Sequence, residues 1–150
     1  DVSVQAQILN LMRDLQDGFG LTYLFISHNL AVVRHMASRI GVMYLGRMVE
    51  VAPTPQLVNQ PTHPYTQALL SAIPEADPRV TRTKERIQLR SPDVPSLLNL
   101  PSGCTFHPRC PAFEAGLCEV TVPQLTDVGG GTRVACHVAV RERGAMVSGR

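Results

Sequence analysis

The sequence predicts an α/β fold followed by a small, loop-rich extension that carries every cysteine of the chain. Three observations lead to this prediction: a helical apolar stripe near the N-terminus, a continuous apolar run at Leu21–Ile26, and the placement of all cysteines in the last third. A strand that is apolar throughout is typical of a parallel sheet covered by helices. At 150 residues, the chain is long enough for one ordinary domain, or for part of one with an appendage.

The first expected element is a helix over residues 4–17. Apolar residues recur there at the spacing of one helix face: Val4, Ile8, Leu11 and Leu15. Ser3 is positioned to be the N-cap, and Gly18 and Gly20 are expected to end the helix. The apolar run Leu21–Ile26 then predicts a buried strand.

A second helix and a hairpin are expected next. Asn29 can cap a helix that starts at Leu30. The stretch IGVMYLGRMVEVA, Ile40–Ala52, places Gly46 between two short strands, which is typical of a hairpin. This order of helix, strand, helix and two strands indicates the second half of an α/β sheet.

Residues 1–51 make up the expected α/β part, and the composition changes after it. Residues 52–78 are rich in proline, and prolines at the start of helical turns predict short helices near 55–60 and 64–72. His63 precedes Pro64 and is expected to start the second of these helices. The remaining parts are, in order, a basic and proline-rich linker at 79–100, a four-cysteine extension at 101–137 and a flexible tail at 138–150.

Composition and charge narrow the class of protein. A net charge of +2 is too small to predict nucleic-acid binding. No apolar run approaches the ~20 residues that a membrane helix needs, and no signal peptide opens the chain. Charged residues make up only 17%, which indicates surfaces that another segment or chain covers. Because the chain starts at Asp1 without an initiator Met, we expect a fragment or a processed product that self-associates through uncovered apolar faces.

His28 is the first candidate functional residue. It follows the expected strand, directly after Ser27 and before the capped helix, where α/β folds place ligand-binding groups. An imidazole at this position can hydrogen-bond a phosphate or position a water molecule. The alternative is a loop histidine that bonds only to backbone, and position alone does not separate the two.

The second candidate site is the set of four cysteines: Cys104, Cys110, Cys118 and Cys136. An even number allows two disulfides in three pairings, but clustered thiols in a reducing compartment more often bind metal. Zinc favours close C-x2–4-C pairs, which this chain lacks, although His107 or His137 could complete a zinc site. Iron–sulfur clusters use four thiolates and accept varied spacings.

Three stretches carry a family resemblance: Asp1 at the start, TYLFISHNLAVV around His28, and HPYTQALLSAIP at His63–Pro74. In this order and spacing, they resemble the downstream part of the ATP-binding subunit of an ABC transporter, in the oligopeptide/dipeptide importer family. The resemblance extends to about His137. It implies the C-terminal fragment of an ABC-type nucleotide-binding domain with a cysteine-containing extension, and a full-length protein that powers peptide import.

The resemblance also implies roles for individual residues. His28 matches the family's switch histidine, which contacts the γ-phosphate of ATP, and Asp1 matches the D-loop aspartate at the dimer interface. Asn29 stands where the family usually has Asp.

The phosphate-binding motif of the family is missing from the sequence. We find no G-x-x-x-x-G-K-[ST] loop, and the family's signature and Walker B motifs would lie before Asp1. The full-length parent is therefore expected to be an ATPase that uses ATP and Mg²⁺. This chain alone is not expected to hydrolyse ATP.

For the extension, the resemblance favours a cluster. PSGCTFHPRCPAFEAGLC and VACH resemble the C-terminal extension of peptide-importer ATPases, in some of which four cysteines ligate a [4Fe–4S] cluster. The ligands carried over to this chain are Cys104, Cys110, Cys118 and Cys136, with zinc as the alternative metal. We expect a structural role for the metal, because a small loop-rich module has little core of its own.

The implied partners are a second ATP-binding subunit and transmembrane permease subunits, without nucleic acid. The implied location is peripheral, on the cytoplasmic side of the inner membrane. Two rival interpretations remain at this point. One is a stand-alone cysteine-rich metal-binding or protein-interaction module, and the other is a secreted domain stabilised by disulfides.

Overall fold

The computed structural model describes residues 2–73 and 86–147 of this mixed α/β chain, so Asp1 lies outside the described residues. The backbone divides into two compact units, Asp1–Ser38 and Arg39–Arg150. The boundary expected after residue 51 therefore falls elsewhere. The hairpin belongs to the same unit as the cysteines, and the N-terminal helices form a unit of their own.

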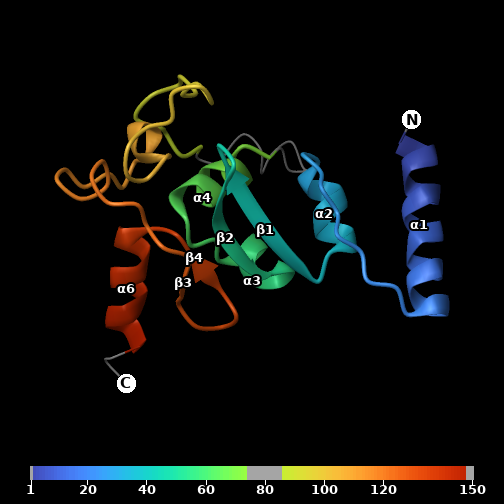
Figure 1. The fold of residues 1–150 in the computed structure, drawn as a ribbon. Coiled ribbons are helices and arrows are strands. Elements are labelled where there is room, and N and C mark those ends of the chain that lie inside the picture. The colour runs from blue at the N-terminus through green and yellow to red at the C-terminus, as the bar shows by residue number, and fades with distance from the viewer. Residues whose placement is uncertain (1, 74–85, 148–150) are drawn as a thin grey trace. The chain divides into compact units, whose positions relative to one another are not determined.

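The first unit contains two helices, α1 (Val2–Phe19) and α2 (Leu30–Met36), joined by a segment without regular secondary structure (Figure 1). The predicted helix over 4–17 is confirmed. The predicted cap is wrong, because α1 already includes Ser3. The helix runs through Gly18 and stops before Gly20, whose φ of 65° favours a residue without a Cβ.

Asn29 caps α2 as predicted. Its Oδ1 accepts hydrogen bonds from the N–H groups of Ala31 and Val32, at 3.1 and 3.4 Å. At its other end α2 contacts α1, because the Arg13 guanidinium donates to the carbonyl of His35 at 2.8 Å. The apolar stripe of α1 remains exposed at four residues: Val4, Ile8, Leu11 and Leu15. This exposure agrees with the expectation of surfaces that another segment or chain covers.

The predicted buried strand at Leu21–Ile26 is wrong for this chain. The segment has no regular secondary structure, and Leu24 and Ile26 are each 92% exposed. A strand is held by hydrogen bonds to a neighbouring strand, and among the described residues every strand belongs to the second unit. The sheet that does form is antiparallel, so the expected parallel arrangement is also wrong.

The hairpin predicted around Gly46 is confirmed. Strand β1 (Arg39–Tyr44) pairs antiparallel with β2 (Arg47–Pro53), and the turn between them consists of Leu45 and Gly46. Both turn residues have positive φ, 45° and 76°, as a two-residue type I′ turn requires. Side chains along β1 alternate between exposed and buried, so one face of the hairpin points into the core.

The cysteine extension adds two strands to this hairpin. Strand β4 (Arg133–Val134) pairs with β2, and β3 (Thr126–Asp127) pairs with β4, which gives the strand order β1-β2-β4-β3. The Ala135 N–H also donates to the carbonyl of Val49 at 2.9 Å. The extension is therefore part of the same sheet as the hairpin, rather than a separate appendage.

Both short helices predicted in the proline-rich segment are present, as α3 (Thr54–Asn59) and α4 (Pro64–Ser71). His63 starts α4 as expected: its Nδ1 accepts a hydrogen bond from the Tyr65 N–H at 3.0 Å. Burial lowers the pKa of His63 from 6.5 to about 4, against a smaller opposing effect of the nearby Ala135 backbone. The imidazole is therefore neutral at ordinary pH, which keeps the Nδ1 lone pair available for capping.

A buried carboxylate holds the start of α4 against the sheet. Glu50 of β2 is fully buried, and its two carboxylate oxygens accept the N–H groups of Thr62 and His63 at 2.8 and 2.9 Å. These N–H groups lie just before the helix, where they have no partner within it. Glu50 therefore fixes the position of α4 relative to β2.

An aromatic cluster joins the hairpin, α4 and the cysteine extension. Phe106 is fully buried, with its ring centroid 5.1 Å from that of Tyr44 and 5.3 Å from that of Tyr65. Phe106 directly precedes the short 3-10 helix η1 (His107–Arg109). The extension thus contributes the central side chain of a core that hairpin and helix surround.

The chain ends in a helix where a flexible tail was expected. Helix α6 (His137–Val147) packs Val138 and Ala139 into an apolar cluster with Val134. An exposed ion pair between Arg141 and Glu114 also links α6 to the extension. The expected tail is therefore wrong for residues 138–147, because part of this segment has apolar side chains that the extension buries. None of the helices in the described part of the chain is long and apolar enough to cross a membrane.

The expected linker at 79–100 can be assessed only from residue 86 onward. Residues 86–100 have no regular helix or strand, but they are attached to the extension. The Arg90 guanidinium lies over the Phe113 ring at 4.1 Å, and the Arg90 N–H donates to the carbonyl of Arg109. This segment therefore runs along the second unit instead of acting as a free spacer.

Candidate functional site

The four cysteines lie in one region of the second unit. Cys104 and Cys110 stand on either side of η1, Cys118 follows in the next turn region, and Cys136 lies between β4 and α6. All four are free thiols. Cys110, Cys118 and Cys136 are buried, whereas Cys104 is partly exposed. The four residues that the sequence nominated as ligands thus all lie in the second unit.

The thiols are close enough to influence one another. The pKa of Cys110 is raised to about 12, mainly by burial and to a smaller extent by the charges of Cys136, Cys104 and Cys118. Burial is also the main cause that raises the pKa of Cys104 and of Cys136, with smaller contributions from neighbouring cysteines. The raised pKa values favour the protonated form of Cys104, Cys110 and Cys136, so binding of a metal or a cluster there would release protons.

Backbone N–H groups face these sulfur atoms and oppose the effect of burial. The donors are Phe106 and His107 toward Cys104, Ala112 toward Cys110, and Val138 and Ala139 toward Cys136. Such hydrogen bonds stabilise the thiolate form, and they are one of the means by which proteins tune bound iron–sulfur clusters. These donors offset only part of the effect of burial, because the pKa of each of the three thiols remains raised.

The described residues do not form a site for a single metal ion. In residues 2–73 and 86–147, no three His, Cys, Asp or Glu side chains are placed so that they could hold one ion. His107 and His137, the expected additional zinc ligands, each use one ring nitrogen on a backbone carbonyl, that of Cys104 at 2.9 Å and that of Thr121 at 3.0 Å.

The backbone beside Cys104 is in close contact with the backbone beside Cys118. The Cys104 N–H donates to the Cys118 carbonyl at 2.8 Å, and the Ser102 hydroxyl donates to the Glu119 carbonyl at 2.7 Å. Between them, Gly103 has a φ of 62°, and a Cβ at this position would lie 2.4 Å from the Cys118 carbonyl oxygen. Only glycine fits this contact without displacing the backbone.

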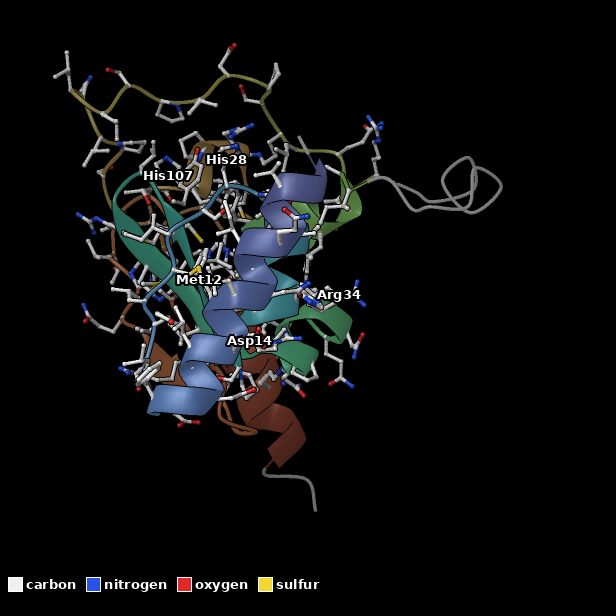
Figure 2. The ribbon with its side chains drawn as sticks, turned by 90° about the vertical axis from the view of Figure 1, so that its right-hand side faces the viewer. Met12, Asp14, His28, Arg34 and His107 are labelled. Atoms are coloured by element: carbon white, nitrogen blue, oxygen red, sulfur yellow. The ribbon has the colours of Figure 1, made fainter. Side chains whose placement is uncertain are left out.

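His28 lies in the first unit, in the segment between α1 and α2, and its side chain is exposed (Figure 2). The local turn is held by the Asn29 N–H, which donates to the Ser27 hydroxyl at 3.0 Å. Since His28 and the cysteines belong to different units, nothing places them in one site. Asp1, the other residue nominated for nucleotide chemistry, lies outside the described residues.

An open hollow of about 600 Å³ lies beside this segment in the first unit. Its lining is mostly apolar and includes Ile8 and Met12 of α1, Phe25 and Ile26. No Lys or Arg lines it, so the hollow has no cation with which to hold a phosphate. The described residues around His28 do not by themselves make a nucleotide pocket.

The sequence did not predict that Glu50 and His63 are buried together and support the second unit. Neither residue was nominated for a role beyond helix initiation by His63. A charged residue inside an otherwise apolar strand segment, RMVEVAP, was the available signal, because a buried carboxylate needs hydrogen-bond donors nearby. The sequence did not say which donors those would be.

Comparison with known proteins gives a consistent set of matches. Residues 49–118 match the family described as the C-terminal region of oligopeptide/dipeptide transporters. The chain is 49% identical over 138 residues to the oligopeptide transport ATP-binding protein AppF of Bacillus subtilis. It is 50% identical over 148 residues to a probable peptide ABC transporter ATP-binding protein of Sinorhizobium fredii. A putative peptide import ATP-binding protein of Brucella ovis is 56% identical over 137 residues.

These alignments cover nearly all of this chain but less than half of each relative. They include 92%, 99% and 91% of the chain for the three proteins named. The chain spans 41%, 41% and 42% of their respective lengths.

Gly103 offers a test of the close backbone contact beside the cysteines. Gly103→Ala should destabilise the chain by about 3 kcal/mol, because a Cβ adds a backbone collision to the cost of positive φ. Gly116→Ala is the matched control, since Gly116 has a φ of 80° but open space around it. The control should cost only about 1 kcal/mol. Urea unfolding measures both variants, and equal losses would contradict the contact.

Proposed function

Because this chain belongs to the C-terminal region of oligopeptide/dipeptide ABC transporter ATP-binding proteins, we propose that it is part of a subunit that uses ATP to drive peptide import. The observation that carries the proposal is the identity of about half of the aligned residues along nearly the whole chain. Peptide is the named cargo of each of these relatives. Identity at this level extends both to the helical unit with His28 and to the unit with the cysteines.

In the intact subunit, we assign His28 to the γ-phosphate of ATP. The support is its exposed side chain in a segment fixed by the Asn29 cap, where an imidazole can reach a ligand bound by other parts of the subunit. Asp1 would act across the interface with a second ATP-binding subunit. Since the chain lacks a phosphate-binding loop, it should not bind or hydrolyse ATP alone.

The proposed partners are a second ATP-binding subunit and transmembrane permease subunits. Such a subunit would work peripherally, on the cytoplasmic side of the inner membrane. The exposed apolar stripe of α1 is consistent with a unit whose apolar face is covered in a larger assembly.

We further propose that Cys104, Cys110, Cys118 and Cys136 hold a [4Fe–4S] cluster. The support is the burial of Cys110, Cys118 and Cys136, and the backbone N–H groups directed at the sulfurs of Cys104, Cys110 and Cys136. Bound through these four thiolates, a cluster would link η1, the following turns and the start of α6. Its role is structural, because it would hold a region whose described strands have only two residues each.

The transport proposal is tested in the complete polypeptide, assembled with its permease subunits in lipid vesicles. His28→Ala should abolish ATP-driven uptake of a labelled oligopeptide, because the γ-phosphate contact is lost. His35→Ala is the matched control, since it removes another exposed histidine from the same unit. Full uptake by the His28 variant would refute its role. ATP hydrolysis by the unaltered complex without uptake of any peptide would refute the proposal that peptide is the transported substrate.

The cluster proposal is tested on the chain itself, prepared without oxygen. It should be brown, with broad visible absorbance and about four iron and four sulfide per chain. Cys110→Ser and Cys136→Ser should each lose most of the iron, whereas His107→Asn should keep it. A colourless protein that binds one zinc per chain, and that loses this zinc when His107 is substituted, would refute the cluster proposal and support a zinc site instead.

A further inference from the structure

We propose that Cys104 and Cys118 are the pair that a small-molecule disulfide oxidises when the four-thiol region carries no cluster, which makes this pair a site of reversible oxidation. Only the alternation between a cluster-bound and a disulfide form rests on the proposed cluster. The disulfide itself rests on the backbone contact between the two residues and on their difference in exposure.

The backbone contact places the two residues within disulfide range. The Cys104 N–H and the Cys118 carbonyl are joined by a hydrogen bond of 2.8 Å. With standard covalent bond lengths on either side of this bond, the two Cα atoms are at most about 6.7 Å apart. Native disulfides join Cα atoms that are 4.4–6.8 Å apart. The Cα separation of the pair is therefore compatible with a disulfide.

Neighbouring contacts hold the two backbone segments together. The Ser102 hydroxyl bonds to the Glu119 carbonyl on one side, and the Glu119 carboxylate accepts the Gly116 N–H at 2.8 Å. Gly103 lies against the Cys118 carbonyl with no room for a Cβ. Little conformational entropy is then left to lose when the two sulfurs bond. No comparable backbone hydrogen bond joins Cys110 to Cys136 in the described residues.

The two thiols also differ in a way that sets the order of reaction. Cys104 is partly exposed, whereas Cys118 is only 6% exposed. A small-molecule disulfide such as oxidised glutathione can therefore reach Cys104 first. The Cys104 sulfur loses its proton and attacks the small disulfide, so one sulfur–sulfur bond breaks, a mixed disulfide forms and one glutathione thiol leaves.

The second step is internal to the protein. The Cys118 sulfur loses its proton and attacks the Cys104 sulfur of the mixed disulfide, releasing the second glutathione thiol. In total, two cysteine thiols are oxidised to one disulfide, and one small disulfide is reduced to two thiols that take up the two protons. A reducing thiol reverses both steps. Because both sulfurs are used, the oxidised chain cannot bind a cluster through four cysteines.

The test uses the cluster-free chain, treated without oxygen with oxidised glutathione and then alkylated and digested. Mass spectrometry should show the loss of two hydrogen atoms per chain and a predominant Cys104–Cys118 link. The same treatment in denaturant should favour Cys104–Cys110, because these cysteines close a shorter loop. We therefore expect the Cys104–Cys118 disulfide to predominate only in the folded chain.

Variants separate the proposed pair from the other two thiols. Cys110→Ser combined with Cys136→Ser should leave the link intact, whereas Cys118→Ser should stop at the glutathione adduct on Cys104. A predominant Cys104–Cys110 or Cys110–Cys136 link in the folded chain would overturn the proposal. So would a glutathione adduct that persists at Cys104 while Cys118 remains free.

A second measurement separates this proposal from the cluster proposal. The oxidised chain should take up no iron and sulfide until a reducing thiol is added, as followed by visible absorbance. Uptake by the oxidised chain without reduction would refute the alternation. If the reduced chain also takes up no iron, the cluster proposal fails, whereas the mapped disulfide is unaffected.

Discussion

The second unit depends on one buried carboxylate. Glu50 lies in β2 without solvent contact, and its oxygens accept the N–H groups of Thr62 and His63. A buried charge is unfavourable unless it is fully hydrogen-bonded, so the chain before α4 has to stay where it can supply both donors. From there α4 directs Tyr65 toward Phe106, whose ring centroid is 5.3 Å away. The position of the cysteine extension thus depends in part on a contact that involves no cysteine.

The cysteine extension is an integral part of the second unit. It is part of the same sheet as the hairpin, because β4 pairs with β2, and it supplies the buried Phe106 to the same core. Its four thiols are therefore attached to the hairpin and α4, rather than to a flexible appendage. A change in the thiols, by cluster binding or by oxidation, would act on a unit that already has a core. We expect such a change to alter local rigidity more than overall folding.

The sequence predicted the elements whose signals are local. The helix over 4–17, the turn at Gly46 and the proline-started helices depend on neighbouring residues, and all of them are present. The strand at Leu21–Ile26 failed because an apolar run does not reveal whether a partner strand is available. Glu50 bonds to residues just before α4, and β4 pairs with β2 from a distant part of the chain. No local sequence pattern predicts such contacts. The cysteines were nominated as one group because they are close in sequence, yet only the structure shows that Cys104 and Cys118 share a backbone contact.

Glu50 holds the start of α4 and, through it, the cysteine extension. Amide hydrogen exchange in Glu50→Gln measures this dependence, because the amide side chain has only one oxygen to offer the two donors. We expect faster exchange at Thr62, His63 and Cys104, and unchanged exchange there in the exposed control Glu142→Gln. Protection at all three amides equal to that of the unaltered chain would contradict it.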